Sequence, residues 1–256
     1  MLLGVDHLVV VVPDLEAAIR SYEQLGFTVV PGGRHPVGTH NALIAFSDWS
    51  YIELIAFYEP SPEHRWWGRL QRGGGLVDFC MQTDDLRGDT AAFRQAGVDI
   101  EDPKPLTRVR LDGYTLRWVL SIPRDPHRGV APFLILDETP RQERIPRQRT
   151  HPNQVTGIGT VTVVVHEVEA VRRWYTRVLG DFGRDVGRDD LAAVGVRFTI
   201  GPHVFDFVAP KGARGPLSDW LRAQGASPYA ATLRTASGKR VFLDETKTLG
   251  ARLSLE

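Results

Sequence analysis

Three polar residues stand within apolar, strand-like sequence: His7 in VDHLVVVV, Glu53 in YIELIAF and Asp78 in GLVDFC. A carboxylate buried without a partner is costly unless its pKa shifts until it is neutral. A divalent cation would satisfy all three side chains, and their N and O donors suit Zn, Mn, Fe, Ni or Co. Such a metal could act as a Lewis acid on a chelating oxygen substrate. The alternatives are a metal-free polar cavity, or structural hydrogen bonds with Glu53 paired to an arginine.

Further residues could contact a substrate. His40 and Asn41, in GTHNAL, begin an expected strand, where they could face the substrate or simply form a strand-start turn; the imidazole could also be a metal ligand. Arg117, in YTLRWVL, could hold a substrate carboxylate bidentately, neutralise Glu53 or lie on the outer face of its sheet. Trp66, in HRWWGRL, could form an apolar wall or pack over a sheet end.

An internal repeat indicates the elements that must position these residues. Residues 4–27 align without gaps on residues 75–98, and a third copy begins at 157. Each copy is an apolar strand, an acid and an amphipathic helix, and the acid is typical of a helix N-cap or first turn. The acids of the three copies are Asp14, Asp85 and Glu167.

Each repeat is followed by three strand-like segments, which makes it a βαβββ module. The strands are expected at about 27–31, 39–46 and 50–58, then 105–110, 114–121 and 132–137, then 184–187, 192–200 and 203–209. A reduced fourth module without a helix is expected over 226–256, and a short helix around 218–224.

Two modules side by side should close their concave faces into a cup. The sequence therefore predicts an α+β fold of tandem βαβββ modules paired into two cup-shaped half-barrel domains. The first domain would span 1–145, with modules 1–60 and 75–138. The second would span 146–256, with module 156–210 and the reduced module. The Pro- and Arg-rich segment 138–155 contains the expected boundary.

This organisation resembles the vicinal-oxygen-chelate superfamily and, within it, the glyoxalase-like domain group of the glyoxalase/bleomycin-resistance/dioxygenase type. The resemblance is carried by VDHLVV at 5–10, GGRHPVGTHNALIAF at 32–46, YIELIAF at 51–57, GLVDF at 75–79, PFLI at 132–135 and THPNQVTGI at 150–158.

The resemblance implies a metal inside the first cup, with His7 on the first strand and Glu53 on the fourth as ligands. The second module offers Asp78 at the first of these positions and no ligand at the second, near Leu136. This departs from the four-ligand sites of the superfamily and from the two-His, one-carboxylate iron site of extradiol dioxygenases. The third module has no histidine at the first position, so the second cup is expected to hold no metal.

Two functions of different kinds follow from the resemblance. The first is a metal-dependent lyase, isomerase or dioxygenase that acts on a small oxygenated metabolite, with His7 and Glu53 as catalytic residues. The second is a non-catalytic protein that sequesters a drug or metabolite, as bleomycin-resistance proteins do. A scaffold whose cups serve only folding is a third, weaker hypothesis.

Composition narrows the partners to small molecules. Acidic and basic residues balance at 31 each, so no basic surplus favours nucleic acid. No apolar run reaches the length of about 18 residues expected of a membrane span. The single cysteine, Cys80, fits a reducing compartment and inert core packing, and the N-terminus lacks a signal-peptide pattern, so a cytoplasmic protein is expected. Four modules could complete both cups in one chain, as a monomer or a homodimer.

Overall fold

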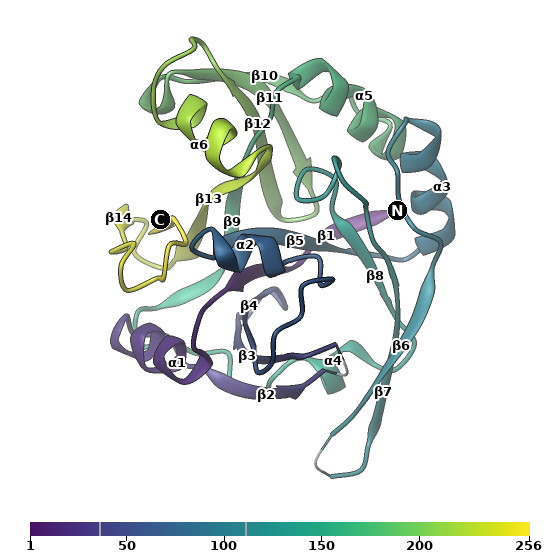
Figure 1. Cartoon of the computed structure of the whole chain (residues 1–256), viewed down its shortest axis with the longest axis vertical. Coiled ribbons are helices and arrows are strands. Elements are labelled where there is room, and N and C mark those ends of the chain that lie inside the picture. The colour runs from purple at the N-terminus through teal and green to yellow at the C-terminus, as the bar shows by residue number, and fades with distance from the viewer. Residues whose placement is uncertain (36, 111) are drawn as a thin grey trace.

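The computed structural model describes residues 1–35, 37–110 and 112–256, which form two mixed β-sheets (Figure 1). The strands of the first sheet are β1 (Leu2–Val11), β2 (Val30–Arg34), β3 (Thr39–Ala45), β4 (Tyr51–Phe57), β5 (Gly75–Thr83), β6 (Lys104–Val109), β7 (Thr115–Ser121) and β8 (Phe133–Asp137). Those of the second are β9 (Val155–Val164), β10 (Arg184–Arg188), β11 (Ala193–Ile200), β12 (His203–Pro210), β13 (Ser227–Thr235), β14 (Val241–Phe242) and β15 (Leu253–Leu255).

Strand order reflects the repeat. The first sheet runs β2-β3-β4-β1-β5-β8-β7-β6, and the second runs β10-β11-β12-β9-β13-β15-β14. In each sheet the leading strand of a module pairs in parallel with the last strand of the same module, β1 with β4 and β9 with β12. It also pairs antiparallel with the leading strand of the next module, β5 or β13. The predicted α+β fold of tandem modules that form cups is confirmed.

Three helices cross over after the leading strands: α1 (Leu15–Gln24), α3 (Leu86–Gln95) and α5 (Val168–Leu179). Asp14 caps α1 by accepting a hydrogen bond from the backbone N–H of Ala17 at 2.7 Å, and Asp85 caps α3 in the same way through Gly88 at 2.9 Å. Glu167 holds the same position before α5 without a side-chain cap bond. The predicted strand–acid–helix pattern thus corresponds to real helix starts.

The remaining helices lie in connections, and they are α2 (Trp67–Gln71), α4 (Arg141–Arg144), a 3₁₀ turn at Asp189–Leu191 and α6 (Pro216–Gln224). In the reduced module, β13 leads to β14 through a turn and not through a helix, as the sequence predicted. None of the described helices has the length and apolar composition needed to cross a membrane.

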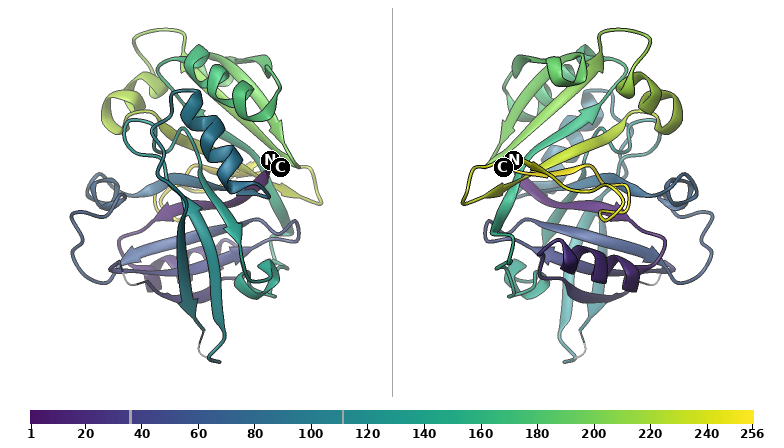
Figure 2. Two further views of the ribbon diagram at one scale, coloured as in Figure 1. Left: turned by 90° about the vertical axis from the view of Figure 1, so that its right-hand side faces the viewer. Right: turned by 90° about the vertical axis from the view of Figure 1, so that its left-hand side faces the viewer.

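The two sheets share one hydrophobic core. The largest buried apolar cluster takes residues from both, and the rings of Phe79 on β5 and Phe205 on β12 lie 5.3 Å apart. Helices α3 and α5 lie side by side (Figure 2), where Phe93 meets Tyr175 edge to face at 5.7 Å. The two cups therefore stabilise each other through their outer faces, which leaves the concave faces for other contacts.

The strand whose start differs most from the expected one is β2, which begins at Val30 instead of residue 27. The backbone N–H of Thr28 donates to Nδ1 of His151 at 2.9 Å, and its hydroxyl donates to the carbonyl of Thr150 at 2.7 Å. Segment 27–29 thus bonds to the connection between the sheets and not to β3.

Candidate active site in the first cup

A cavity of about 1000 Å³ occupies the concave side of the first sheet and is called the first cup below. One part of its wall is apolar and includes Ile55, Trp66, Trp118, Leu120, Ile122, Phe133 and Ile135. The other part carries polar and charged groups and includes His7, Asn41, Glu53, Arg65, Arg108 and Arg144. The two most conspicuous residues of the sequence, His7 and Glu53, therefore share one cavity.

His7 lies on β1 and is only 5% exposed. Its ring stacks on Tyr51 with centroids 4.6 Å apart, and its Nδ1 lies 2.7 Å from a carboxylate oxygen of Asp6. Because an ionised carboxylate can only accept, this contact places the proton of a neutral His7 on Nδ1. The Nε2 atom then presents a lone pair toward Glu53, whose Oε2 is 3.4 Å away.

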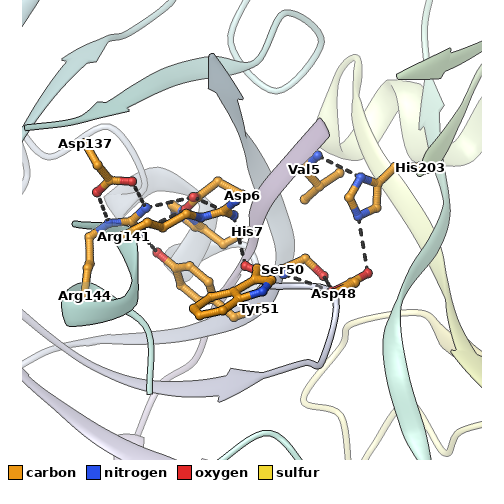
Figure 3. Close-up of polar contacts among 11 residues, drawn as sticks. Val5, Asp6, His7, Asp48, Ser50, Tyr51, Asp137, Arg141, Arg144 and His203 are labelled. Atoms are coloured by element: carbon orange, nitrogen blue, oxygen red, sulfur yellow. Dashed lines mark hydrogen bonds and ion pairs between the residues drawn. The ribbon is translucent and has the colours of Figure 1, made fainter. Parts of the chain in front are cut away.

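Asp6 is fully buried and is kept ionised by an arginine from the connection between the sheets (Figure 3). Both of its oxygens accept hydrogen bonds from Arg144 in α4, at 3.0 and 2.8 Å, and Arg141 approaches to 3.0 Å. Burial opposes ionisation, but the charge of Arg144 and the hydrogen bond from His7 hold the pKa of Asp6 well below its usual range. Arg144 also binds Asp137. Sequence reasoning missed this cluster, and its only signal was an acid directly before His7.

Glu53 lies on β4 and is 8% exposed. Its Oε1 accepts a hydrogen bond of 2.5 Å from the side-chain amide of Asn41 on β3, whose Oδ1 in turn accepts from the backbone N–H of Gly33 at 2.9 Å. The neighbouring Gly32 leaves room for that amide, since a Cβ there would lie 2.0 Å from Asn41 Oδ1. Asn41 lines the cup, which is one of the two placements that the sequence left open, and it also fixes the direction of the Glu53 carboxylate.

Asp78, the third expected metal ligand, is not brought to His7 and Glu53. In the antiparallel β1–β5 pairing, Cys80 lies opposite His7, and Asp78 lies opposite Val9, two residues further along β1. The buried Asp78 carboxylate accepts hydrogen bonds from the indole N–H of Trp66 at 3.0 Å and from the backbone of Phe79 at 2.9 Å. Burial raises its pKa. In this position Asp78 holds Trp66 against the cup.

Two of the expected substrate contacts lie outside the cup wall. His40 lies next to Asn41 on β3, so strand alternation turns it to the other face, where its ring meets Tyr58 edge to face at 6.0 Å. Arg117 on β7 is exposed, whereas the adjacent Trp118 lines the cup. Trp66 forms part of the apolar wall, as the sequence suggested.

His35, in the connection between β2 and β3, also lines the cup and was not among the residues expected to contact a substrate. Its Nδ1 lies 2.9 Å from the hydroxyl of Thr39, and burial lowers its pKa. The signal that could have identified it is the closeness in sequence of a histidine and a strand-start threonine across the β2–β3 turn.

A group of three side chains could provide metal donors: Asp6, His7 and Cys80 offer ligand atoms within 4.8 Å of one another, the only such group of three or more in the described residues. However, both oxygens of Asp6 already bind the guanidinium of Arg144. Burial also raises the pKa of the Cys80 thiol well above its usual value, which opposes the thiolate form. A cation in this cluster would therefore have to displace the charge of Arg144.

A metal fits better between Nε2 of His7 and Oε2 of Glu53. Two ligands about 2.1 Å from a tetrahedral ion lie about 3.4 Å apart, which is the distance between these atoms. They supply two protein ligands, whereas catalytic zinc sites commonly have three.

The second sheet encloses a smaller cavity of about 460 Å³. There Asp206 on β12 corresponds in position to Glu53 on β4. Its carboxylate binds the guanidinium of Arg197 at 2.6 and 2.8 Å and that of Arg188 at 3.2 Å. The acid of the second cup is thus neutralised from within the sheet.

Comparisons with known proteins agree with this architecture. A family model described as "Glyoxalase-like domain" matches residues 5–179. The crystal structure of a hypothetical protein from Staphylococcus aureus is similar with a TM-score of 0.71 and 17% identity, over 100% of this chain and 99% of that one. A mutant of 4-hydroxymandelate synthase from Streptomyces coelicolor is similar with a TM-score of 0.60 and 15% identity, over 98% of this chain and 75% of that one.

Among curated proteins, none matches the sequence. The two solved structures are too distant in sequence to show more than a shared fold. The family model covers well over half of the chain, and this chain therefore belongs to the glyoxalase-like domain family.

Proposed function

We propose that the first cup is the active site of a lyase or isomerase that moves a proton on a small oxygenated metabolite, with His7 and Glu53 as the catalytic pair. The observation that carries the proposal is the approach of His7 Nε2 to Glu53 Oε2 at 3.4 Å on the wall of a large cavity. The opposite end of each side chain is fixed, by Asp6 and by Asn41 respectively. Fixed, adjacent acid–base groups are what proton transfer requires.

The proton path follows from the hydrogen bonds. Nε2 of neutral His7 removes a proton from a carbon next to a substrate carbonyl, and the imidazolium that forms lies between the carboxylates of Asp6 and Glu53. Both carboxylates lie within 3.4 Å of that cation and stabilise it electrostatically. Return of the proton to a neighbouring atom completes an isomerisation, and loss of a leaving group instead completes an elimination.

A divalent metal ion would be an alternative use of this pair, because an Nε2 lone pair that binds a metal cannot also accept a proton. Nε2 of His7 and the Glu53 carboxylate would hold it, and it would polarise a substrate oxygen. A non-haem iron dioxygenase site needs two histidines and a carboxylate, whereas this pair supplies one of each. A lyase or isomerase therefore suits the residues better than a dioxygenase.

The test combines metal content with proton exchange. Protein purified without a tag or chelator is compared with Glu53→Gln and His7→Ala, with Glu63→Gln at the cup mouth as the matched control. We expect wild type and control to exchange a carbon-bound proton for deuterium in D₂O, at C3 of a small 2-oxo carboxylate or at C2 of a 2-hydroxy carboxylate, as observed by NMR. Both site variants should lose this exchange. Exchange that persists in both site variants refutes the proposal. Elemental analysis of the same samples decides whether a metal depends on Glu53.

A second candidate is a binding protein without turnover. It is favoured by the size of the cup and by its largely apolar wall, which could enclose a molecule that no residue attacks. Recovery of a tightly bound ligand in unchanged form, from wild type and from Glu53→Gln alike, would support it. A chemically altered ligand recovered only from wild type would exclude it.

A further inference from the structure

We infer that the first cup recognises a carboxylate attached to a compact apolar body, and that Arg65 is the anchor for that carboxylate with Arg108 as a second cation. This inference rests on the proposed function in so far as it names the substrate class of the same site. It stands on two arginines that the proton-transfer scheme does not use.

Arg65 lies just before α2, in the connection between β4 and β5. Its guanidinium lies against two aromatic rings, with Cζ 4.1 Å from the Trp66 centroid and 4.3 Å from the Phe133 centroid. It donates no hydrogen bond and forms no ion pair within the described residues, and its Nη1 is buried without an acceptor there. Burial lowers its pKa. Such a cation requires an acceptor that these residues do not supply.

Arg108 on β6 is a second cation of the same kind across the cup. Its Nε is buried and finds no acceptor in the part of the chain that the structure describes. Burial lowers its pKa, with Tyr51 and Glu53 as the nearest groups that oppose this effect. No ion pair within 4.0 Å joins it to a described carboxylate, so the cup contains two incompletely paired cations.

Two other arginines, the buried Arg144 and the partly buried Arg188, show what complete pairing looks like. Arg144 binds Asp6 and Asp137, and Arg188 binds Asp190 and Asp206. Arg69 also has buried donors without a partner in the described residues, but it does not line the first cup, whereas Arg65 and Arg108 both do. An anion that enters the cup would complete their pairing.

The aromatic contacts of Arg65 favour a planar anion. With rings over the guanidinium, its N–H edge is the part left for a ligand, and a carboxylate matches that edge in the bidentate arrangement. Phe133 also connects this anchor to the catalytic pair, since its ring lies 5.2 Å from the His7 ring. A carboxylate on Arg65 would thus hold the adjoining carbons on the side of the cup where His7 lies.

The chemistry of the remaining wall indicates what kind of group the rest of the ligand should be. Beyond the arginines, the cup is lined by branched aliphatic side chains and by Trp118, and among the aliphatic residues are Leu43, Ile55, Leu120, Ile122 and Ile135. Burial of an aryl or branched alkyl group against them is favourable, because it removes apolar surface from water. The inferred ligand class is therefore a small aryl or branched aliphatic carboxylate.

The experiment measures binding without turnover, by calorimetric titration of phenylacetate into the full chain. Arg65→Met and Arg108→Met are compared with Arg117→Met, which removes an exposed arginine on the outer face of β7. We expect Arg65→Met to weaken phenylacetate binding by about 10- to 100-fold, as loss of a charged hydrogen-bond partner should. Arg108→Met should give a smaller loss, and the control should bind as wild type does. Circular dichroism verifies that each variant is folded.

Two further ligands separate charge from shape. Phenylacetamide has the same outline without the charge and should bind as weakly to wild type as phenylacetate binds to Arg65→Met. Inorganic phosphate distinguishes a carboxylate site from a general anion site. Equal binding of phenylacetate to wild type and Arg65→Met overturns the inference, as does equal binding of acid and amide, tighter binding of phosphate, or failure of wild type to bind phenylacetate.

The outcome is separable from that of the proposed function. His7→Ala and Glu53→Gln should retain carboxylate binding while they lose proton exchange. If wild type binds phenylacetate through Arg65 but no carboxylate exchanges its proton, the proposed function fails and the inference stands. If exchange depends on His7 but binding ignores Arg65, the inference fails and the proposed function stands.

Discussion

Replacement of Arg144 by methionine tests whether Asp6, the carboxylate next to His7, is a buried anion held by this arginine. Methionine fills a similar volume but leaves Asp6, which is fully buried, without its main partner. Removal of one member of a buried pair costs about 3–5 kcal/mol of unfolding free energy. Arg141 remains 3.0 Å from Asp6 and limits the loss. We therefore expect Arg144→Met to lower the free energy of unfolding by about 3 kcal/mol at pH 7.

The loss should depend on pH in a defined direction. In wild type the pKa of Asp6 is held well below its usual value, so the pair stabilises the fold above about pH 4 and this contribution disappears as pH falls through the folded pKa. Without Arg144, burial should raise the pKa of Asp6. At low pH the carboxyl group would then be protonated, and a neutral carboxyl group costs less to bury than an unpaired carboxylate. The difference between wild type and Arg144→Met should therefore narrow from pH 7 toward pH 3.

The assay is urea unfolding followed by tryptophan fluorescence at several pH values, with Arg117→Met as the control. An exposed arginine should change the unfolding free energy by no more than about 0.5 kcal/mol. A loss below about 1 kcal/mol in Arg144→Met at pH 7, or a loss that is the same at every pH, would refute the reasoning that Asp6 is a buried anion held by this arginine.

Three other predictions use the same unfolding assay or a chemical probe. Trp66→Phe should cost about 1–3 kcal/mol, because Asp78 loses its indole donor, and a change near zero would contradict that bond. Cys80 should react with a thiol reagent only after unfolding in urea, since the folded protein buries it completely and burial raises the pKa of its thiol; rapid native labelling would exclude this. Gly201→Ala should destabilise by more than about 1 kcal/mol, because φ is +57° and a Cβ would lie 2.0 Å from a β1 carbonyl oxygen. Gly212→Ala, where a Cβ meets nothing, is its control.

Most of the fold could be predicted because each copy of the repeat shows the same local sequence patterns. Alternation and N-cap acids identify strands and helix starts within a few residues, and the same order in successive copies predicts paired modules. The start of β2 could not be predicted, because Thr28 bonds to His151 from a distant connection. Contacts of this range leave no periodic trace in the sequence.

The site was predicted in part for the same reason. His7 and Glu53 lie on neighbouring strands of one module, and the repeat together with family resemblance was enough to bring them together. Asp78 was expected beside them because an alignment of two copies shows which residues are equivalent but not which residues of two antiparallel strands lie opposite each other. Arg65 and Arg144 belong to connections, where no hydrophobic period indicates which way a side chain points. The residues that neutralise or recruit charge were therefore the ones that required a structure.

The two cups carry an acid at equivalent strand positions, but the two acids are paired differently. Asp206 and Glu53 occupy matching strands, yet Asp206 is neutralised by Arg197 and Arg188, whereas Glu53 is held by the neutral Asn41 and approached by His7. In the second cup acid and base satisfy each other, so an incoming ion would have to break existing pairs. In the first cup Glu53 forms no ion pair with Arg108, so each of these charged side chains can still bind a ligand or an ion. The difference in pairing, more than the difference in volume, is the reason to place ligand binding in the first cup and to regard the second as support for the shared core.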